Sequence, residues 1–245
     1  MASNPPGACC VTGFKHEGNP SGEIKAIGNI ETYFSYPKDN KTPEKAVLIL
    51  SDVFGIYPNS QLVADDFAAQ GYLAVIPDLF QGDAIKLDDF ESGKADLPAW
   101  LQNHQTTHVD PIIESVIKHL REELGVKKIG GVGYCFGGKY VCRFLKDGKL
   151  DAGYTAHPSF ITHEELGAIQ GPLSIAAAEI DQIFTTPLRH ESEEILKKTG
   201  QPWQINLFSN VVHGFAVRGD LSVKQNRFAK EQALLQAVYW FGQYL

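Results

Sequence analysis

The chain has 245 residues, a formal net charge of −7 and a hydrophobic content of 43%, which is typical of one globular domain with a large core. The acidic balance argues against a nucleic-acid binder, which would carry a basic face, and no basic amphipathic run indicates a membrane-binding surface. The apolar runs are too short to span a bilayer and the N-terminus lacks the apolar core of a secretory signal, so we expect a cytoplasmic protein.

The first 29 residues are predicted to form an N-terminal extension that packs on the rest of a single domain, which spans residues 1–245. The extension contains the adjacent cysteines Cys9 and Cys10. Adjacent cysteines lack the spacing of a zinc knuckle, and four cysteines are too few for a disulfide framework in this chain. We therefore expect Cys9 and Cys10 to be packed or partly exposed, and we expect neither a metal nor an organic cofactor.

Beyond the extension, apolar runs of strand length alternate with amphipathic runs of helix length. Residues 30–36 (IETYFSY) alternate with period two, which predicts an early antiparallel strand. Ala46–Leu50 and Tyr72–Ile76 are predicted as buried strands, and a helix at Asn59–Gln70 lies between them. Residues 81–108 are polar, acidic and irregular, and we expect a loop or short helices there.

The second half of the chain continues this alternation. Asp110 is predicted to cap a helix that has Pro111 at its first position and ends at Gly125. A strand at Lys128–Gly133 then leads into a helix at Gly137–Lys146. The remaining predicted elements are strands at Leu150–Ala156 and Leu173–Ala177, a helix at Thr186–Lys198, a strand at Trp203–Phe208 and a terminal helix at Ser222–Leu245. This order predicts an α/β protein with a mostly parallel central sheet and helices on both faces.

A glycine-rich motif, GYCFGG at residues 133–138, lies between a predicted strand and a predicted helix. It fits the G-x-[SC]-x-G pattern of a nucleophile elbow, in which the glycines permit a sharp turn. The N-terminus of the following helix favours a thiolate at this point. The alternative is a glycine-rich turn that happens to contain a buried cysteine, but the position between strand and helix favours Cys135 as a nucleophile.

A cysteine nucleophile requires a base, and the base requires a group that orients it. On this architecture the nucleophile, the acid and the histidine follow one another along the chain, each after a later strand. His213 follows the strand WQINLF, and Asp181 follows LSIAAA with Glu179 as a nearby competitor. His157 also follows a predicted strand, but as the base it would precede the acid, so we expect it to line the pocket.

Five motifs in the order LILSDVFG, VIPDLF, GYCFGG, AEID and HGF resemble the dienelactone hydrolase family of α/β-hydrolases. The resemblance begins at about residue 30, and the extension resembles that of the fungal-type members. The resemblance implies the α/β-hydrolase fold and a catalytic triad of Cys135, Asp181 and His213 that opens lactones and cleaves activated esters. It also implies an oxyanion hole formed by the backbone N–H groups of Val53 and Phe136.

Two departures from the bacterial members of the family concern the thiol and the substrate. Those members have a glutamate where this chain has Asp52, and that glutamate pairs with the resting thiol; Asp52 can alternatively cap the turn at Gly55. They also bind a substrate carboxylate with two arginines. Here PDLFQGD has no arginine, and Arg218 is displaced by one residue from the position of the second arginine. Alternatively, Arg218 forms an ion pair with Asp220 at the surface. We therefore expect a substrate other than dienelactone itself.

We predict a hydrolase that cleaves a lactone or an activated ester through a thioester acyl-enzyme. The predicted substrate pocket comprises Phe80, His157, Phe160, Phe215 and Arg218. Its aromatic walls favour a neutral or phenolic aromatic lactone or aryl ester. Two alternatives remain open, namely a fungal secondary-metabolism enzyme that isomerises or cyclises a polyketide-like intermediate at the same site, and a non-catalytic small-molecule binding protein. The sequence does not decide whether the chain forms a homodimer.

Overall fold

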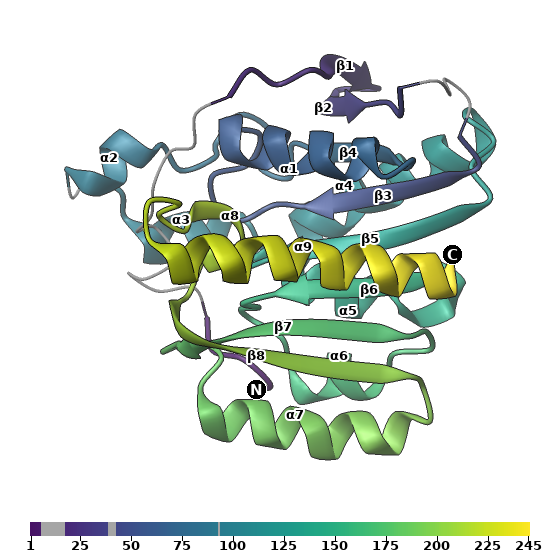
Figure 1. Cartoon of the computed structure of the whole chain (residues 1–245). Coiled ribbons are helices and arrows are strands. Elements are labelled where there is room, and N and C mark those ends of the chain that lie inside the picture. Colours follow the sequence, from purple (N-terminus) through teal and green to yellow (C-terminus); the bar gives the residue numbers. More distant parts are fainter. Residues whose placement is uncertain (6–17, 39–42, 93) are drawn as a thin grey trace.

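A computed structural model of the chain describes residues 1–5, 18–38, 43–92 and 94–245. The predictions about Cys9 and Cys10 fall outside these residues. Within them, eight strands form one sheet in the order β1-β2-β4-β3-β5-β6-β7-β8 (Figure 1). The strands are β1 (Glu23–Ile27), β2 (Ile30–Ser35), β3 (Lys45–Leu50), β4 (Leu73–Pro77), β5 (Lys128–Tyr134), β6 (Ala152–Ala156), β7 (Leu173–Ile180) and β8 (Trp203–Val212).

The sheet is mostly parallel, as the sequence predicts. The hairpin β1–β2 is antiparallel and β2 is antiparallel to β4, whereas all neighbours from β4 to β8 are parallel. The carboxyl ends of the parallel strands therefore meet at one edge of the sheet, on the left in Figure 1. That edge is where open α/β sheets bind their ligands.

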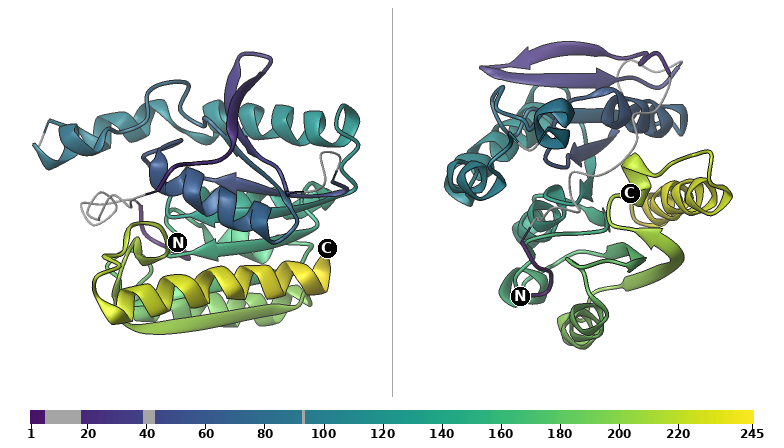
Figure 2. Two further views of the ribbon diagram at one scale, coloured as in Figure 1. Left: turned by 45° about the horizontal axis from the view of Figure 1, so that its top comes forward. Right: turned by 90° about the vertical axis from the view of Figure 1, so that its left-hand side faces the viewer.

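Helices cover both faces of the sheet. They are α1 (Pro58–Ala69), α2 (Leu87–Glu91), α3 (Leu97–Asn103), α4 (Thr106–Glu122), α5 (Gly137–Phe144), α6 (His163–Gly167), α7 (Thr186–Thr199), α8 (Phe215–Arg218) and α9 (Lys224–Tyr244), with a 3₁₀ turn η2 at Lys146–Gly148. In Figures 1 and 2, α1 and α9 lie on one face, and α4 and α5 lie on the other. Among the described residues, no helix is long and apolar enough to cross a membrane.

The central strand β3 shows why the strand sequences are continuously apolar. Val47 and Ile49 pack into the cluster that contains residues of α1 and α9. Leu48 and Leu50 pack into the cluster that contains residues of α4 and α5. A strand covered on both faces needs apolar side chains at every position, which explains the run AVLIL.

The start of α4 differs from the sequence prediction. The helix begins at Thr106, so Pro111 lies inside it rather than at its first position. Asp110 does not cap the helix and instead forms an ion pair with Arg143. The extra turn buries Val109 completely in the core, and this burial offsets the hydrogen bond that Pro111 cannot make.

Three short elements and part of β8 were not predicted. β1, α6 and α8 are absent from the prediction, and β8 continues to Val212 rather than ending at Phe208. The longer strand forms because β7 also extends to Ile180 and pairs with β8 across an irregularity in register. These extensions carry the chain to the residues at the strand ends that build the site.

Candidate active site

The elbow around Cys135 is a sharp turn between β5 and α5. Cys135 adopts a left-handed backbone conformation with φ 50°, which costs a non-glycine residue roughly 1–3 kcal/mol and is common at functional sites. The turn also requires glycine at neighbouring positions. A Cβ at Gly133 would lie 2.7 Å from the carbonyl oxygen of Gly137, and a Cβ at Gly137 would lie 1.9 Å from that of Leu50. The glycines of GYCFGG therefore permit close backbone packing around the cysteine.

The thiol of Cys135 is fully buried beside polar side chains. Its Sγ lies 3.7 Å from the hydroxyl oxygen of Ser159, which follows β6. It also shares a hydrogen bond and a charge interaction with His213, which follows β8. Groups from three separate loops thus meet at this sulfur.

His213 is paired with Asp181, and both side chains are buried. Nδ1 of His213 lies 2.9 Å from Oδ2 of Asp181, while Oδ1 of Asp181 accepts hydrogen bonds from the backbone N–H groups of Ile183 and Phe184. Burial by itself lowers the pKa of His213, but the Cys135 charge and the hydrogen bonds to Asp181 and Cys135 outweigh it and raise the pKa to about 10. An imidazolium of this pKa stabilises a thiolate beside it.

The competing acid Glu179 faces away from this pair. It is exposed, and its carboxylate accepts a hydrogen bond from the backbone N–H of Asn210 at 2.7 Å. The geometry therefore favours Asp181 as the partner of His213.

The backbone N–H groups of Val53 and Phe136 donate no hydrogen bond to another residue in the part of the chain that the structure describes. Phe136 immediately precedes α5, and Val53 lies in the turn after β3. Both residues therefore lie in turns that follow neighbouring parallel strands, at the same edge of the sheet.

Asp52 and Arg218 form a buried ion pair beside the elbow. Oδ2 of Asp52 also accepts a hydrogen bond from the hydroxyl of Tyr57 at 3.0 Å, and Oδ1 accepts one from the backbone N–H of Phe54 at 3.1 Å. Burial raises the pKa of Asp52, the Cys135 charge raises it further, and the Arg218 cation opposes the shift. Asp52 therefore caps its turn, binds Arg218 and interacts electrostatically with the thiol.

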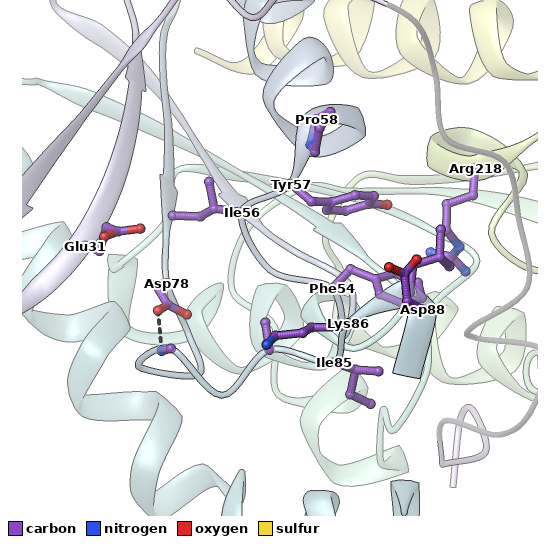
Figure 3. A pocket seen from close by; sticks show the side chains of 13 residues that line it. Glu31, Phe54, Ile56, Tyr57, Pro58, Asp78, Ile85, Lys86, Asp88 and Arg218 are labelled. Carbon is purple, nitrogen blue, oxygen red and sulfur yellow. Dashed lines mark hydrogen bonds between the residues drawn. The ribbon is translucent and has the colours of Figure 1, made fainter. Parts of the chain in front are cut away.

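A cavity of about 490 Å³ lies next to this ion pair (Figure 3), within the usual size range of small-molecule sites. Its apolar wall includes Phe54, Ile56, Ile85 and Leu87, and Arg218 reaches it from α8. Its remaining charged groups are Glu31, Asp78, Lys86 and Asp88.

Comparison with known proteins identifies the family to which the chain belongs. The model of the dienelactone hydrolase family matches residues 30–245. The chain is a member of the dienelactone hydrolase family. As a member of this family it is a hydrolase of carboxylic esters or lactones, and the resemblance seen in the motifs is confirmed.

Two fungal relatives match this dienelactone hydrolase family member over its entire length. Hydrolase pyvD of Aspergillus violaceofuscus is 52% identical, with 100% of this chain and 99% of the relative covered. Hydrolase tropI of Talaromyces stipitatus is 49% identical with the same coverage of both chains. Among solved structures, a putative dienelactone hydrolase from Klebsiella pneumoniae has a TM-score of 0.76 at 15% identity and covers 91% of this chain and 98% of its own. That likeness confirms the α/β-hydrolase fold.

The side chains predicted to form the substrate pocket of this family member are distributed differently. Arg218 lines the cavity of about 490 Å³, and it pairs with Asp52 rather than with Asp220 at the surface. Phe160 lines a separate cavity of about 220 Å³ together with Phe136. Phe80, His157 and Phe215 are fully buried and line neither of these two cavities, because they pack around the elbow and His213.

His157 packs directly on His213. Its ring centroid lies 5.0 Å from that of His213 and 5.6 Å from that of Phe215. Burial, followed by the charges of His213 and Arg218, lowers the pKa of His157 well below its usual range, so its ring is neutral. Neither ring nitrogen has a hydrogen-bond partner among the described residues.

An aromatic cluster ties the irregular segment before α4 to the elbow. The ring centroids of Phe80 and Phe136 are 5.3 Å apart, and those of Trp100 and Phe136 are 5.7 Å apart. Trp100 also donates a hydrogen bond to the carbonyl oxygen of Asp83, whose carboxylate pairs with His104. The segment is therefore docked by aromatic packing as well as by polar contacts.

Sequence reasoning missed two residues of the site, Tyr57 and Ser159. Tyr57 opens α1 and bonds to Asp52, and Ser159 follows β6 and contacts Cys135. Ser159 stands in the quoted stretch YTAHPSF, directly after a predicted strand. A polar residue at the carboxyl end of a parallel strand was the signal that would have found it.

Replacing Asp52 with asparagine is expected to lower the free energy of unfolding by about 3 kcal/mol or more, because it removes the carboxylate that forms an ion pair with the buried Arg218 cation. Urea denaturation measures this loss. The matched control is Asp78→Asn, because Asp78 caps the turn after β4 and has no ion-pair partner among the described residues. Equal, small losses in both variants would contradict the importance of the ion pair.

The same variant removes a negative charge that interacts with the Cys135 thiolate. Alkylation of Cys135 is therefore expected to reach half its maximal rate at a lower pH in Asp52→Asn than in the wild type.

Proposed function

We propose that this protein hydrolyses a neutral lactone or activated ester through a thioester on Cys135. The observation that carries the proposal is the buried chain from Asp181 through His213 to Cys135, which provides a nucleophile, a base and an orienting acid in contact. The names of the two fungal relatives, both called hydrolases, support the same class of reaction.

In the first half of the reaction, the Cys135 thiolate attacks the carbonyl carbon of the substrate. The oxyanion of the tetrahedral intermediate accepts hydrogen bonds from the N–H groups of Val53 and Phe136. The bond from carbon to the leaving oxygen then breaks, and the His213 imidazolium donates its proton to that oxygen. The products of this half are a free enol, phenol or alcohol and a thioester on Cys135.

In the second half, His213 is neutral and removes a proton from a water molecule that attacks the thioester. The second tetrahedral intermediate expels the Cys135 thiolate, and the acid product leaves. Asp181 keeps the proton of His213 on Nδ1 through both halves, because its carboxylate accepts the hydrogen bond at that atom. A thiolate is a good leaving group, so the site suits activated esters better than amides.

The charges of the cavity beside Arg218 support a neutral substrate. The cations that line it are Arg218 and Lys86, and the carboxylates are Glu31, Asp78 and Asp88. Since Asp52 already pairs with Arg218, the lining carries no excess of positive charge for a substrate carboxylate. The apolar wall formed by Phe54 and Ile85 suits an aromatic or aliphatic body.

A burst experiment tests covalent hydrolysis. With p-nitrophenyl acetate, we expect a stoichiometric burst of p-nitrophenol followed by slower turnover, because a thioester accumulates when its hydrolysis is slower than its formation. Mass spectrometry of the quenched protein should find the acetyl group on Cys135. Absence of both the burst and any turnover would leave a binding protein as the better reading. A physiological product that takes up no oxygen from ¹⁸O-labelled water would favour isomerisation or cyclisation.

A substrate competition tests the charge argument. We expect an uncharged aryl ester to be preferred over its carboxylated analogue by about tenfold in kcat/KM, which corresponds to about 1.4 kcal/mol. Preference for the carboxylated ester by a similar factor would contradict a neutral substrate. The variants Arg218→Gln and Lys86→Gln would then show which cation holds the carboxylate.

A further inference from the structure

The first residues of the chain bridge two loops of the candidate site. The backbone N–H groups of Ala2 and Ser3 donate to the carbonyl oxygen of Ile161 at 2.7 and 3.0 Å, and the hydroxyl of Ser3 accepts from the N–H of Ile161 at 2.8 Å. The N–H of Asn4 donates to the carbonyl oxygen of Ile183 at 2.9 Å. Ala2 and Ser3 are fully buried between these loops. We call residues 2–4 the strap.

The loop after β6 needs such support because its backbone is strained. His157 and Phe160 both adopt left-handed conformations, with φ 40° and φ 68°, which side chains other than glycine rarely adopt. Strained conformations persist only where surrounding contacts fix them. The strap supplies such contacts at Phe160, because Asn4 accepts the hydrogen bond of the Phe160 N–H at 2.8 Å and Ser3 accepts that of the next residue, whereas the N–H of His157 donates to Ala176.

Each loop held by the strap carries a group of the site. Ser159 lies between the two strained residues and contacts the sulfur of Cys135. Asp181 begins the second loop, where its carboxylate accepts hydrogen bonds from Ile183 and Phe184 as well as from His213. The carbonyl oxygen of Ile183 is the atom to which Asn4 donates. The strap therefore contacts both loops within a few residues of the groups that face the nucleophile.

We propose that the strap is a positioning element for the triad, with Ser3 as its central residue, that fixes Ser159 against Cys135 and Asp181 against His213. This inference rests on the proposed function of the triad. It goes beyond the family match, because that match begins at residue 30 and does not include the strap. The strap touches no reacting atom and acts through the two loops.

The main test is deletion of residues 2–5, with Pro5→Ala as the matched control because Pro5 is exposed. We expect the deletion to lower kcat by at least about tenfold at temperatures well below its melting point, since small displacements of catalytic groups carry costs of this order or larger. KM is expected to change by less than about twofold, because the strap residues do not line the cavity beside Arg218. Pro5→Ala should match the wild type in both constants.

A second readout separates positioning from general stability. If Asp181 is held less firmly, the pKa of His213 falls and its imidazolium stabilises the Cys135 thiolate less. The pH at which alkylation of Cys135 is half-maximal should therefore rise in the deletion variant. A folded deletion variant with unchanged kcat and an unchanged alkylation profile would overturn the proposal, even if its melting temperature fell.

A second variant tests the strap if the deletion prevents folding. If the deletion variant does not fold, Ser3→Ala replaces it, and we expect at least about a threefold loss of kcat with the same rise in the alkylation profile. An unchanged Ser3→Ala variant would then overturn the proposal. Failure of the proposed function can be told apart from failure of the strap proposal. If the wild type shows no burst, the proposed function is wrong, and the alkylation profile of the variants still tests the strap.

Discussion

Replacing Cys135 with alanine is expected to lower kcat/KM for an aryl ester by at least about a hundredfold, equivalent to about 2.7 kcal/mol of barrier stabilisation. Without the sulfur no thioester can form, and the remaining groups can only polarise the carbonyl and assist water. Alanine accepts the left-handed backbone of the elbow about as well as cysteine, so the variant should fold. Steady-state kinetics and circular dichroism measure the two parts of this expectation.

The matched control is Cys142→Ala. Cys142 is the other buried free cysteine among the described residues, and burial raises the pKa of its thiol. Cys142→Ala should therefore retain activity, and iodoacetamide should inactivate the wild type by modifying Cys135 alone within the described part of the chain. An active Cys135→Ala variant that retains more than about one hundredth of wild-type kcat/KM would exclude covalent catalysis at this residue.

Replacing Asp181 with asparagine is expected to lower kcat by about 10⁴-fold, the size of effect seen when a triad acid becomes an amide. The amide would donate toward Nδ1 of His213 and favour the wrong tautomer. The Cys135 charge and Asp181 together raise the pKa of His213 to about 10, and the variant loses the second contribution, so the alkaline limb of the pH–rate profile should move to lower pH. Glu179→Gln is the control and should cost little, because Glu179 is exposed and its carboxylate accepts a hydrogen bond from a backbone N–H. The opposite ranking would reassign the acid.

The sequence predicts those parts of the fold that depend on residues close together in the chain. Central strands such as β3 are recognisable because both faces are buried, which leaves an uninterrupted apolar run. Cys135 is recognisable because its turn requires glycine at fixed offsets. The positions of Asp181 and His213 follow from the order of strands, since each stands at the carboxyl end of a parallel strand.

The contacts that the sequence did not reveal join residues far apart in the chain. Asp52 and Arg218 are 166 positions apart, and either could have paired with a nearer group. Asp110 resembles a helix cap by its local sequence, but it binds Arg143 from another helix. The strap could not be predicted for the same reason, because Ser3 bonds through its backbone N–H and its hydroxyl to Ile161, which lies 158 positions away in the chain. Tertiary packing decides such contacts, and local propensity does not.

The aromatic cluster at the elbow gives the protein a built-in optical probe. The indole of Trp100 lies against the ring of Phe136, the residue directly after the nucleophile, and 4.3 Å from the ring of His104. Indole emission depends on the polarity and the quenching groups around the ring. Movement of the segment that carries Trp100 away from Phe136 therefore changes the fluorescence of the protein without any attached dye.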